Sequence, residues 1–474
     1  MRSSARSPLR LAKERSQSMT HADIIDIRGL SLSAASAAAV ERFDALIDDL
    51  YYYRLGVGDR LDALLQEFPE FVLAHVLKGY SLMTEYTLDA QPKARAYLLQ
   101  AEALPANPRE RLHQEALRAW IAQDFSARAA AWEQILVEWP LDLLALRQHT
   151  GTLFWTGDKR HQAEVSAGVA GDWGPQTPGY AHFLSAHAFA MEEAGQYVVA
   201  ERCAHEALAL QPQDLWALHG LVHVFEMQGR IREGIDLLSD AARFLNDYNL
   251  FRGHLWWHLS LLKLSQARFD EVLDLFDREV YPQSSTFYLD VQNGASLLAR
   301  LEFQGVDVGL ARWERLAQAS LRSATQSTLW FTSMHHVMAL TRSGRLSAVQ
   351  STFDYLSSVG TSSTQASLAH ELAQAAAAFY QDQPREALGR MLPVRQRHAE
   401  LGASHVQQDL YDQIMVMAAL QLGDLPRVRQ LLKARLSTRI WDAATWQVYE
   451  SRSRCVDEAH DAAAVRAALR WDLN

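Results

Sequence analysis

The amino-acid sequence predicts an all-α protein in which helix-turn-helix repeats stack into an α-α superhelix (a solenoid). A short turn pattern recurs along the chain, apolar residues recur at helical spacing, and no convincing run of alternating apolar and polar residues predicts a strand. The 474 residues are too many for one compact core. They are ordinary for an array in which each repeat packs on the next.

The turn pattern reads small residue, any residue, bulky residue, any two residues, small residue. It occurs at Gly195–Ala200, again at Gly229–Gly234 after 34 residues (229 minus 195), and at Ala267–Val272 after 38 (267 minus 229). Weaker copies begin at Gly157, Gly344, Asp382 and Gly423. These spacings are typical of two antiparallel helices with their turns.

Each position of the pattern has a physical reason. A glycine permits the left-handed turn that ends the first helix of a pair. The bulky residue enters the groove between helices, and the last small residue lets the second helix approach closely. Pro212 then prevents the helix that follows Gly195 from continuing. This is the tetratricopeptide pattern, so the sequence predicts tetratricopeptide-like repeats.

Composition narrows the class of protein. Hydrophobic residues make up 49% and charged residues 22%, as in soluble globular proteins. The net charge of -10 argues against nucleic acid as a partner. Two cysteines, Cys203 and Cys455, exclude a disulfide framework and a Cys-rich zinc site and indicate a cytoplasmic protein. No apolar stretch approaches the roughly 18 residues that cross a bilayer, so we expect no membrane contact.

The organisation along the chain follows from these points. We expect residues 1–20 to form a disordered basic tail, or to precede a true start at Met19. We expect residues 21–474 to form one tetratricopeptide-like solenoid domain with a central His-rich cavity.

Histidines cluster on two neighbouring predicted helices. His219, His223 and Glu226 follow one another at i, i+4 and i+7, so they share one helix face. His254 and His258 form a second His-x-x-x-His pair in the next repeat. The two helices should lie roughly 8–10 Å apart, so the imidazoles could converge.

Three interpretations of this cluster stay open. Imidazoles with a carboxylate suit a divalent transition metal such as zinc, iron, manganese, cobalt or copper. They would equally suit a polar pocket that binds an anion or performs acid-base chemistry. A hydrogen-bonded network without a ligand is the third. Trp257 is a candidate wall of a pocket beside the cluster.

The run from Asp214 to Gly229, together with His254–His258, resembles the signature of the tetratricopeptide repeat protein 38 family. The resemblance extends from about residue 40 to 440. It implies that the fifth, ninth and twelfth places of a repeat, here His219, His223 and Glu226, face a concave groove. The sequence departs from the family pattern at Ser333, where a carboxylate is usual, and at Gln408, where an arginine is usual.

The resemblance also implies that polar residues from distant repeats surround one cavity. The spacing of the histidines predicts metal ligands at His219, His223, Glu226, His254 and His258. We further predict catalytic roles for Glu226 and His335, and a substrate pocket that includes Trp257, Asp290, His405 and Asp409.

Two functional hypotheses follow. The first is a metal-dependent enzyme, hydrolytic or oxidative, that binds a small molecule in the cavity and uses a divalent transition metal. Glu226 would be a ligand or a general base. The alternative is a non-catalytic interaction scaffold that binds a partner peptide in an open groove, which is the default for repeat proteins. A purely structural assembly protein has no positive support in the sequence.

Overall fold

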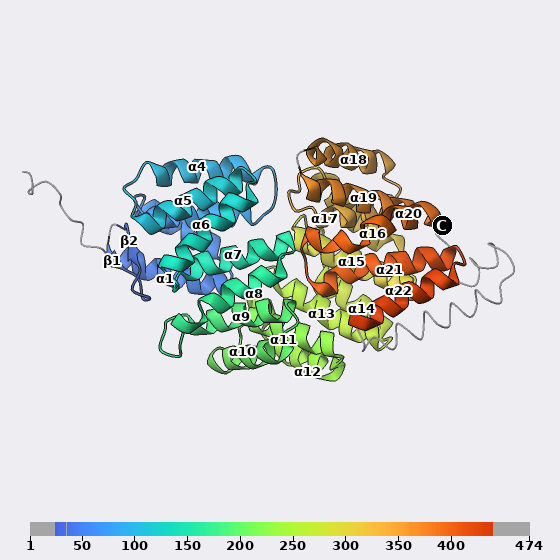
Figure 1. The fold of residues 1–474 in the computed structure, drawn as a ribbon, viewed down its shortest axis with the longest axis horizontal. Coiled ribbons are helices and arrows are strands. Elements are labelled where there is room, and N and C mark those ends of the chain that lie inside the picture. Colours follow the sequence, from blue (N-terminus) through green and yellow to red (C-terminus); the bar gives the residue numbers. More distant parts are fainter. Residues whose placement is uncertain (1–23, 35, 362, 439–474) are drawn as a thin grey trace, which may run out of the picture.

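The computed structural model describes residues 24–34, 36–361 and 363–438, and it confirms an all-α superhelix (Figure 1). The only strands in this part of the chain are the short antiparallel pair β1 (Ile24–Ile25) and β2 (Ser31–Leu32). The predicted tail at residues 1–20 lies outside the described residues. Within the described ranges, no helix is both long and apolar enough to cross a bilayer.

The helices of the first half pack on one another in chain order. They are α1 (Ala37–Tyr51), α2 (Val57–Glu67), α3 (Val72–Met83), α4 (Ala90–Glu102), α5 (Pro108–Ile121), α6 (Phe125–Glu138), α7 (Leu143–Thr156), α8 (Lys159–Gly168), α9 (Tyr180–Glu193), α10 (Tyr197–Leu210), α11 (Leu215–Gln228) and α12 (Ile231–Ala241).

The helices of the second half continue the same stacking. They are α13 (Arg252–Ser265), α14 (Phe269–Leu275), α15 (Tyr288–Phe303), α16 (Leu310–Ser323), α17 (Thr332–Arg342), α18 (Leu346–Gly360), α19 (Thr364–Tyr380), α20 (Pro384–Val394), α21 (His405–Gln421) and α22 (Leu425–Thr438). A π-helical turn (Phe276–Val280) follows α14, and a 3₁₀ segment (Arg395–Leu401) follows α20.

The predicted repeat turns are confirmed. Every one of the predicted turn residues has a positive φ, including the non-glycines Ala267 (57°) and Asp382 (59°). Two further left-handed turns, at Gln123 (φ 58°) and Gly305 (φ 80°), lie where the repeat spacing requires a turn that the sequence pattern did not predict. Gly305 lies 38 residues after Ala267 (305 minus 267), so the repeat is more regular than the sequence pattern indicated.

The small residue that ends the pattern is needed for close packing. A Cβ at Gly234 would lie 2.8 Å from Cδ1 of Leu262, a separation that real side chains do not show. Ala200, at the same place one repeat earlier, is fully buried. The physical reason given for the pattern therefore holds at both of its strongest copies.

The superhelix returns onto itself, so turns far apart in sequence lie side by side. The amide of Asn249 donates to the carbonyl of Tyr53 at 2.9 Å, and the amide of Thr328 donates to the carbonyl of Tyr86 at 2.8 Å. In Figure 1, α7 runs from the N-terminal group of helices toward the C-terminal group. Its end packs against the 3₁₀ segment 395–401.

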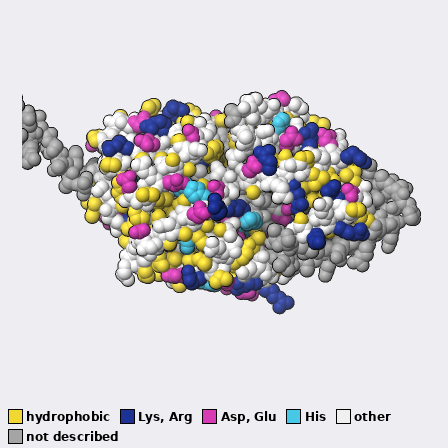
Figure 2. Space-filling view, viewed as in Figure 1, with side chains coloured by type: hydrophobic (Ala, Val, Ile, Leu, Met, Phe, Trp, Pro, Cys, Tyr) yellow, Lys and Arg dark blue, Asp and Glu magenta, His cyan; other side chains and the backbone are white. Residues whose placement is uncertain are grey.

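One helix lies between the two main hydrophobic cores. Leu218 and Val222 of α11 belong to the core of the C-terminal half, whereas Ala217 and Leu221 belong to that of the N-terminal half. The remaining face of α11 carries the predicted histidines. Acidic and basic side chains are interspersed on the face seen in Figure 2, without a broad basic area there.

We predict that the contact between α7 and residues 399–402 stabilises the closed superhelix. Gly402 has φ 72° and ψ -152°, a conformation close to exclusive to glycine, and a Cβ there would lie 2.5 Å from Cα of Trp155. Gly402→Ala should lower the free energy of unfolding by about 3 kcal/mol, measured by urea denaturation.

The matched control is Gly168→Ala at the end of α8, where no atom lies within 4 Å of the added Cβ. This variant should keep wild-type stability. Equal stability of the two variants would show that the contact contributes nothing to closure.

Candidate metal centre and the central cavity

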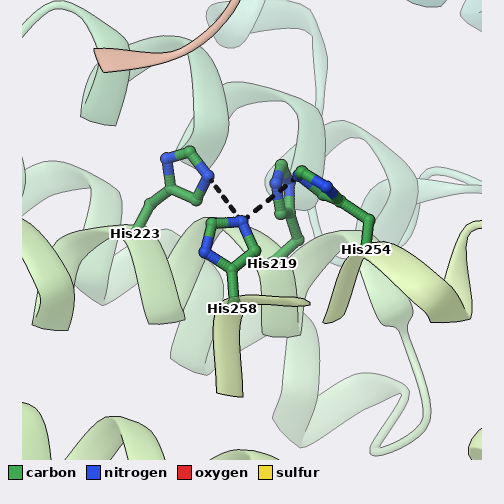
Figure 3. A group of neighbouring side chains, drawn as sticks. All are labelled: His219, His223, His254 and His258. Carbon is green, nitrogen blue, oxygen red and sulfur yellow. Dashed lines mark hydrogen bonds between the residues drawn. The ribbon is translucent and has the colours of Figure 1, made fainter. Parts of the chain in front are cut away.

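Two neighbouring helices position four histidines. The carboxylate of Asp214 begins α11 by accepting the amides of Trp216 and Ala217 at 2.8 and 3.1 Å. Gly229 ends the helix with φ 73°. His219 and His223 project from α11 toward His254 and His258 on α13 (Figure 3). These four residues are called the histidine quartet below, and all four are buried.

The quartet converges through its ring nitrogens. Nε2 of His258 lies 3.1 Å from Nε2 of His223 and 3.2 Å from Nε2 of His254 (Figure 3). One nitrogen of His219 completes a set in which all four ligand atoms lie within 4.8 Å of one another. Four buried imidazoles at this separation could hold a metal ion.

The opposite nitrogens of three rings face hydrogen-bond acceptors. Nδ1 of His223 lies 3.2 Å from Oε2 of Glu192, and Nδ1 of His258 lies 3.0 Å from Oε2 of Glu226. Nδ1 of His254 lies 2.9 Å from Oδ1 of Asn293. With Nδ1–H donated to these oxygens, each Nε2 carries a free lone pair. Metal-bound histidines typically have such an acceptor behind them.

A network of hydrogen bonds alone does not satisfy these nitrogens. If His223 is protonated, its Nε2–H can donate to Nε2 of His258. The lone pair on Nε2 of His254, which faces the same atom, is then left without a donor. Neither nitrogen of His219 has a hydrogen-bond partner among the described residues. A buried polar group without a partner costs roughly 1–3 kcal/mol. The quartet is therefore suited to a bound ligand.

The electrostatic environment keeps most of the quartet neutral. Burial lowers the pKa of His219 and His258 well below the usual range, and it lowers the pKa of His254 to about 3. Burial also opposes protonation of His223, but the neighbouring carboxylates, Glu192 foremost, raise its pKa. Neutral imidazole is the form that binds metals.

Two predicted residues lie behind the quartet. Glu226 contacts Nδ1 of His258, so it is on the far side of that ring from the converging nitrogens. Trp257 stacks on His254 with ring centroids 5.1 Å apart and donates to Oγ of Ser296 at 3.1 Å. It is fully buried and is not among the residues that line the cavity described below. It packs behind the quartet, and its role at a pocket wall stays a prediction.

The remaining predicted site residues have contacts of their own. Nδ1–H of His335 donates to the carbonyl of Phe331 at 3.1 Å, and burial lowers the pKa of His335 to about 3. Arg435 binds Asp409 at 2.6 and 2.8 Å. Nε2 of His405 lies 3.1 Å from the carbonyl of Glu193. Burial raises the pKa of Asp290 to about 6. None of these four lines the cavity described here.

A cavity of about 450 Å³ adjoins the quartet where the superhelix returns onto itself. We call it the central cavity. Turns and helices between residues 50 and 407 form its walls. The lining residues include Tyr53, Tyr86, Arg147, Trp155, Phe189, Trp216, His219, Phe251, His254 and Tyr288. This size is typical of small-molecule sites, which span about 300–1,000 Å³.

Two aromatic wall residues have unusual backbone conformations. Tyr53 and Tyr86 have φ of 58° and 51°, in the left-handed region that bulky residues seldom adopt. The carbonyl of each accepts one of the amides that close the superhelix. Strain of this kind persists where the surrounding structure fixes it, and it clusters at functional sites.

Sequence reasoning did not identify several residues of this region. Glu192 and Asn293 orient quartet histidines from α9 and α15, and Arg147 points to the cavity from α7. No local pattern in the sequence marks them, because each acts through a helix from another repeat. The charged pair Glu192 and Glu193 at the end of a mainly apolar helix is the one signal that was available.

A second cluster lies on α6, α7 and α8. Glu133, His149 and His161 place ligand atoms within 4.8 Å of one another, with His149 buried and the other two partly exposed. Oε1 of Glu133 lies 3.0 Å from Nε2 of His161 and 3.3 Å from Nε2 of His149. Any measurement of bound metal must therefore separate this cluster from the quartet.

We predict that Glu226 tunes the quartet through His258. Glu226→Gln removes the negative charge behind the ring, so Zn²⁺ affinity should fall about 10- to 100-fold while full occupancy is still reached at high Zn²⁺. Titration against a competing chelator measures this. Glu233→Gln, on the exposed face of α12, should leave the affinity unchanged. Equal affinities in both variants would remove Glu226 from the metal centre.

No model of a known protein family matches this chain. The interpretation of the site therefore rests on its own geometry.

Proposed function

We propose that this protein is a metal-dependent enzyme that acts on a small molecule bound in the central cavity. The quartet would hold a divalent transition metal. The observation that carries the proposal is the convergence of three Nε2 atoms beside His219, whose two nitrogens have no hydrogen-bond partner in the described structure. His219 and His254 both line the cavity, so a substrate there would lie against the metal centre.

The spacing of the nitrogens supports metal binding. A tetrahedral ion with bonds of about 2.1 Å places its ligand nitrogens about 3.4 Å apart. The two short Nε2–Nε2 distances of the quartet, 3.1 and 3.2 Å, need only a small adjustment to reach this value. An all-imidazole set suits zinc, iron, cobalt and copper better than calcium or magnesium.

The chain's own residues would have distinct tasks. Glu192, Glu226 and Asn293 hold three imidazoles in orientation from behind, and Trp257 packs against two of them. The bound ion would activate a water molecule or polarise the substrate. The proposal covers hydrolytic and oxidative reactions alike. The catalytic role of His335 and the pocket roles of Asp290, His405 and Asp409 stay predictions.

The shape of the superhelix supports a small molecule more than a peptide. A peptide scaffold needs a groove that is open along its length. Here the turns at Tyr53 and Tyr86 pair with turns of the C-terminal half, and the cavity lies within this closed course.

Membership in the tetratricopeptide repeat protein 38 family is part of the same proposal. The helical repeat architecture is compatible with it. At the two departures from the family pattern, Ser333 is buried on α17 and Gln408 donates to the carbonyls of Gly402 and Ala403 at 2.7 and 3.1 Å. A cytoplasmic location also stays a prediction.

The test is the metal content of the full chain. We would measure it by inductively coupled plasma mass spectrometry after incubation with zinc, manganese, iron and cobalt salts and removal of excess metal. All proteins would carry His161→Ala, so that the cluster on α6, α7 and α8 cannot contribute. About one equivalent of one metal is expected, and the His219→Ala/His223→Ala pair should lose it.

Two controls make the result specific. His205→Ala, on the exposed face of α10, should keep the metal. A second pair, His254→Asn and His258→Asn, retains polar side chains of similar size and should also lose the metal while it stays folded by circular dichroism. Absence of metal from the His161→Ala protein under all conditions would overturn the metal-centre proposal.

A further inference from the structure

One positive charge stands alone in the wall of the central cavity. Among the described residues that line it, Arg147 is the only lysine or arginine, and no aspartate or glutamate lines it. Arg147 is half-buried there. A charge that is partly removed from water is normally paired with an acidic group, because its desolvation is costly. Its partner in this cavity is therefore expected to come with the ligand.

The protein holds the guanidinium of Arg147 without neutralising it. Its Cζ atom lies 4.8 Å from the ring centroids of both Tyr51 and Trp216, and it donates to the hydroxyl of Tyr53 at 3.3 Å. These aromatic contacts fix its position and leave its charge in place. A positioned guanidinium is well suited to bind a planar carboxylate with two parallel hydrogen bonds.

The nearby carboxylate of Asp214 does not pair with Arg147. It is close enough to sense the charge of Arg147, but its Oδ1 accepts the amides of Trp216 and Ala217 at the start of α11. Its buried Oδ2 has no hydrogen-bond partner within the described part of the chain. Arg147 therefore remains available to a ligand.

The rest of the wall favours a flat apolar body. Tyr53 stacks on Phe251 with ring centroids 4.3 Å apart and planes 20° apart, and Phe189 packs against Trp216 at 4.8 Å. Stacked and edge-on rings of this kind offer broad apolar surfaces to a planar molecule. Polar side chains are about as numerous on the wall as aromatic rings, but most of the surface that the wall presents to the cavity is apolar.

Trp216 joins this anion site to the quartet. Its ring lies 4.8 Å from the guanidinium carbon of Arg147 and 4.9 Å from the ring of His219. A ligand anchored by its anionic group on Arg147 would therefore lie along Trp216, beside His219 and His254.

We infer that the central cavity binds small organic acids, with a planar apolar body against the aromatic wall and a carboxylate on Arg147. This names the substrate class of the proposed enzyme. It rests on the proposed function only for the idea that the ligand is transformed, because binding itself needs the cavity and Arg147 alone.

The test uses matched probes on the full chain. Each probe framework (phenylpropanoic, naphthylacetic and indoleacetic) is supplied as the carboxylate, the neutral amide and the corresponding amine, and affinity is measured by isothermal titration calorimetry. At least one carboxylate should bind about 10-fold or more tightly than its amide, because a charge-assisted hydrogen bond contributes roughly this factor. The amines should bind most weakly.

Variants assign the preference to Arg147. Arg147→Gln should abolish the preference for carboxylate over amide while amide binding stays within about two-fold, and Arg147→Lys should keep part of it. Arg160→Gln, on the exposed face of α8, should change nothing. The inference is overturned if no carboxylate binds at millimolar concentration, if amides or amines bind as well, or if the preference survives Arg147→Gln.

Probe binding and metal content, both measured on the wild-type protein, separate this inference from the proposed function. Carboxylate preference without any metal in the wild-type protein would leave the acid site standing and sink the metal centre. Bound metal without carboxylate preference would do the reverse.

Discussion

Amides of two turns in the C-terminal half donate to carbonyls of two turns in the N-terminal half, and this pairing holds the two halves of the superhelix together. Asn249 reaches Tyr53, and Thr328 reaches Tyr86. Backbone groups in turns need partners wherever water is excluded. The amide of one turn and the carbonyl of the other satisfy each other, so distant repeats are held together around one cavity. Residues from α7, α11 and α13 line this cavity.

The site also depends on where α11 lies between the two hydrophobic cores. Two faces of this helix are buried in apolar packing, so its histidine face cannot rotate into solvent. The same rigidity applies to α13, whose Trp257 is fixed by its hydrogen bond to Ser296. Imidazoles on two such helices keep their separation without help from a flexible loop, which is a requirement for a pre-organised metal or ligand site.

Local sequence rules predicted the repeat and the quartet well. The left-handed turns follow from residues such as Gly195 and Gly229, since few residues adopt that conformation at low cost. The shared face of His219 and His223 follows from helical spacing alone. The turn at Gly305 was missed because its neighbourhood does not reproduce the small-and-bulky pattern. Trp257 was expected at a pocket wall; it bonds to Ser296 of α15 and does not line the central cavity, so that role stays a prediction.

The contacts that could not be predicted from the sequence depend on the curvature of the repeat array. The contacts of Glu192 with His223, of Asn293 with His254 and of Arg147 with Trp216 each join different helices. Their existence is set by the summed rotation from repeat to repeat, which no single repeat encodes. The closing turns are a stronger case, because they pair residues with no shared pattern at all.

The strained tyrosines have one consequence for how the protein behaves as a whole. Tyr53 and Tyr86 present their rings to the cavity and their carbonyls to the closing hydrogen bonds. A guest that packs on those rings therefore also holds the two turns in place. Occupancy of the cavity and closure of the superhelix are thermodynamically linked, so a bound molecule acts as a cross-brace between distant repeats of the array.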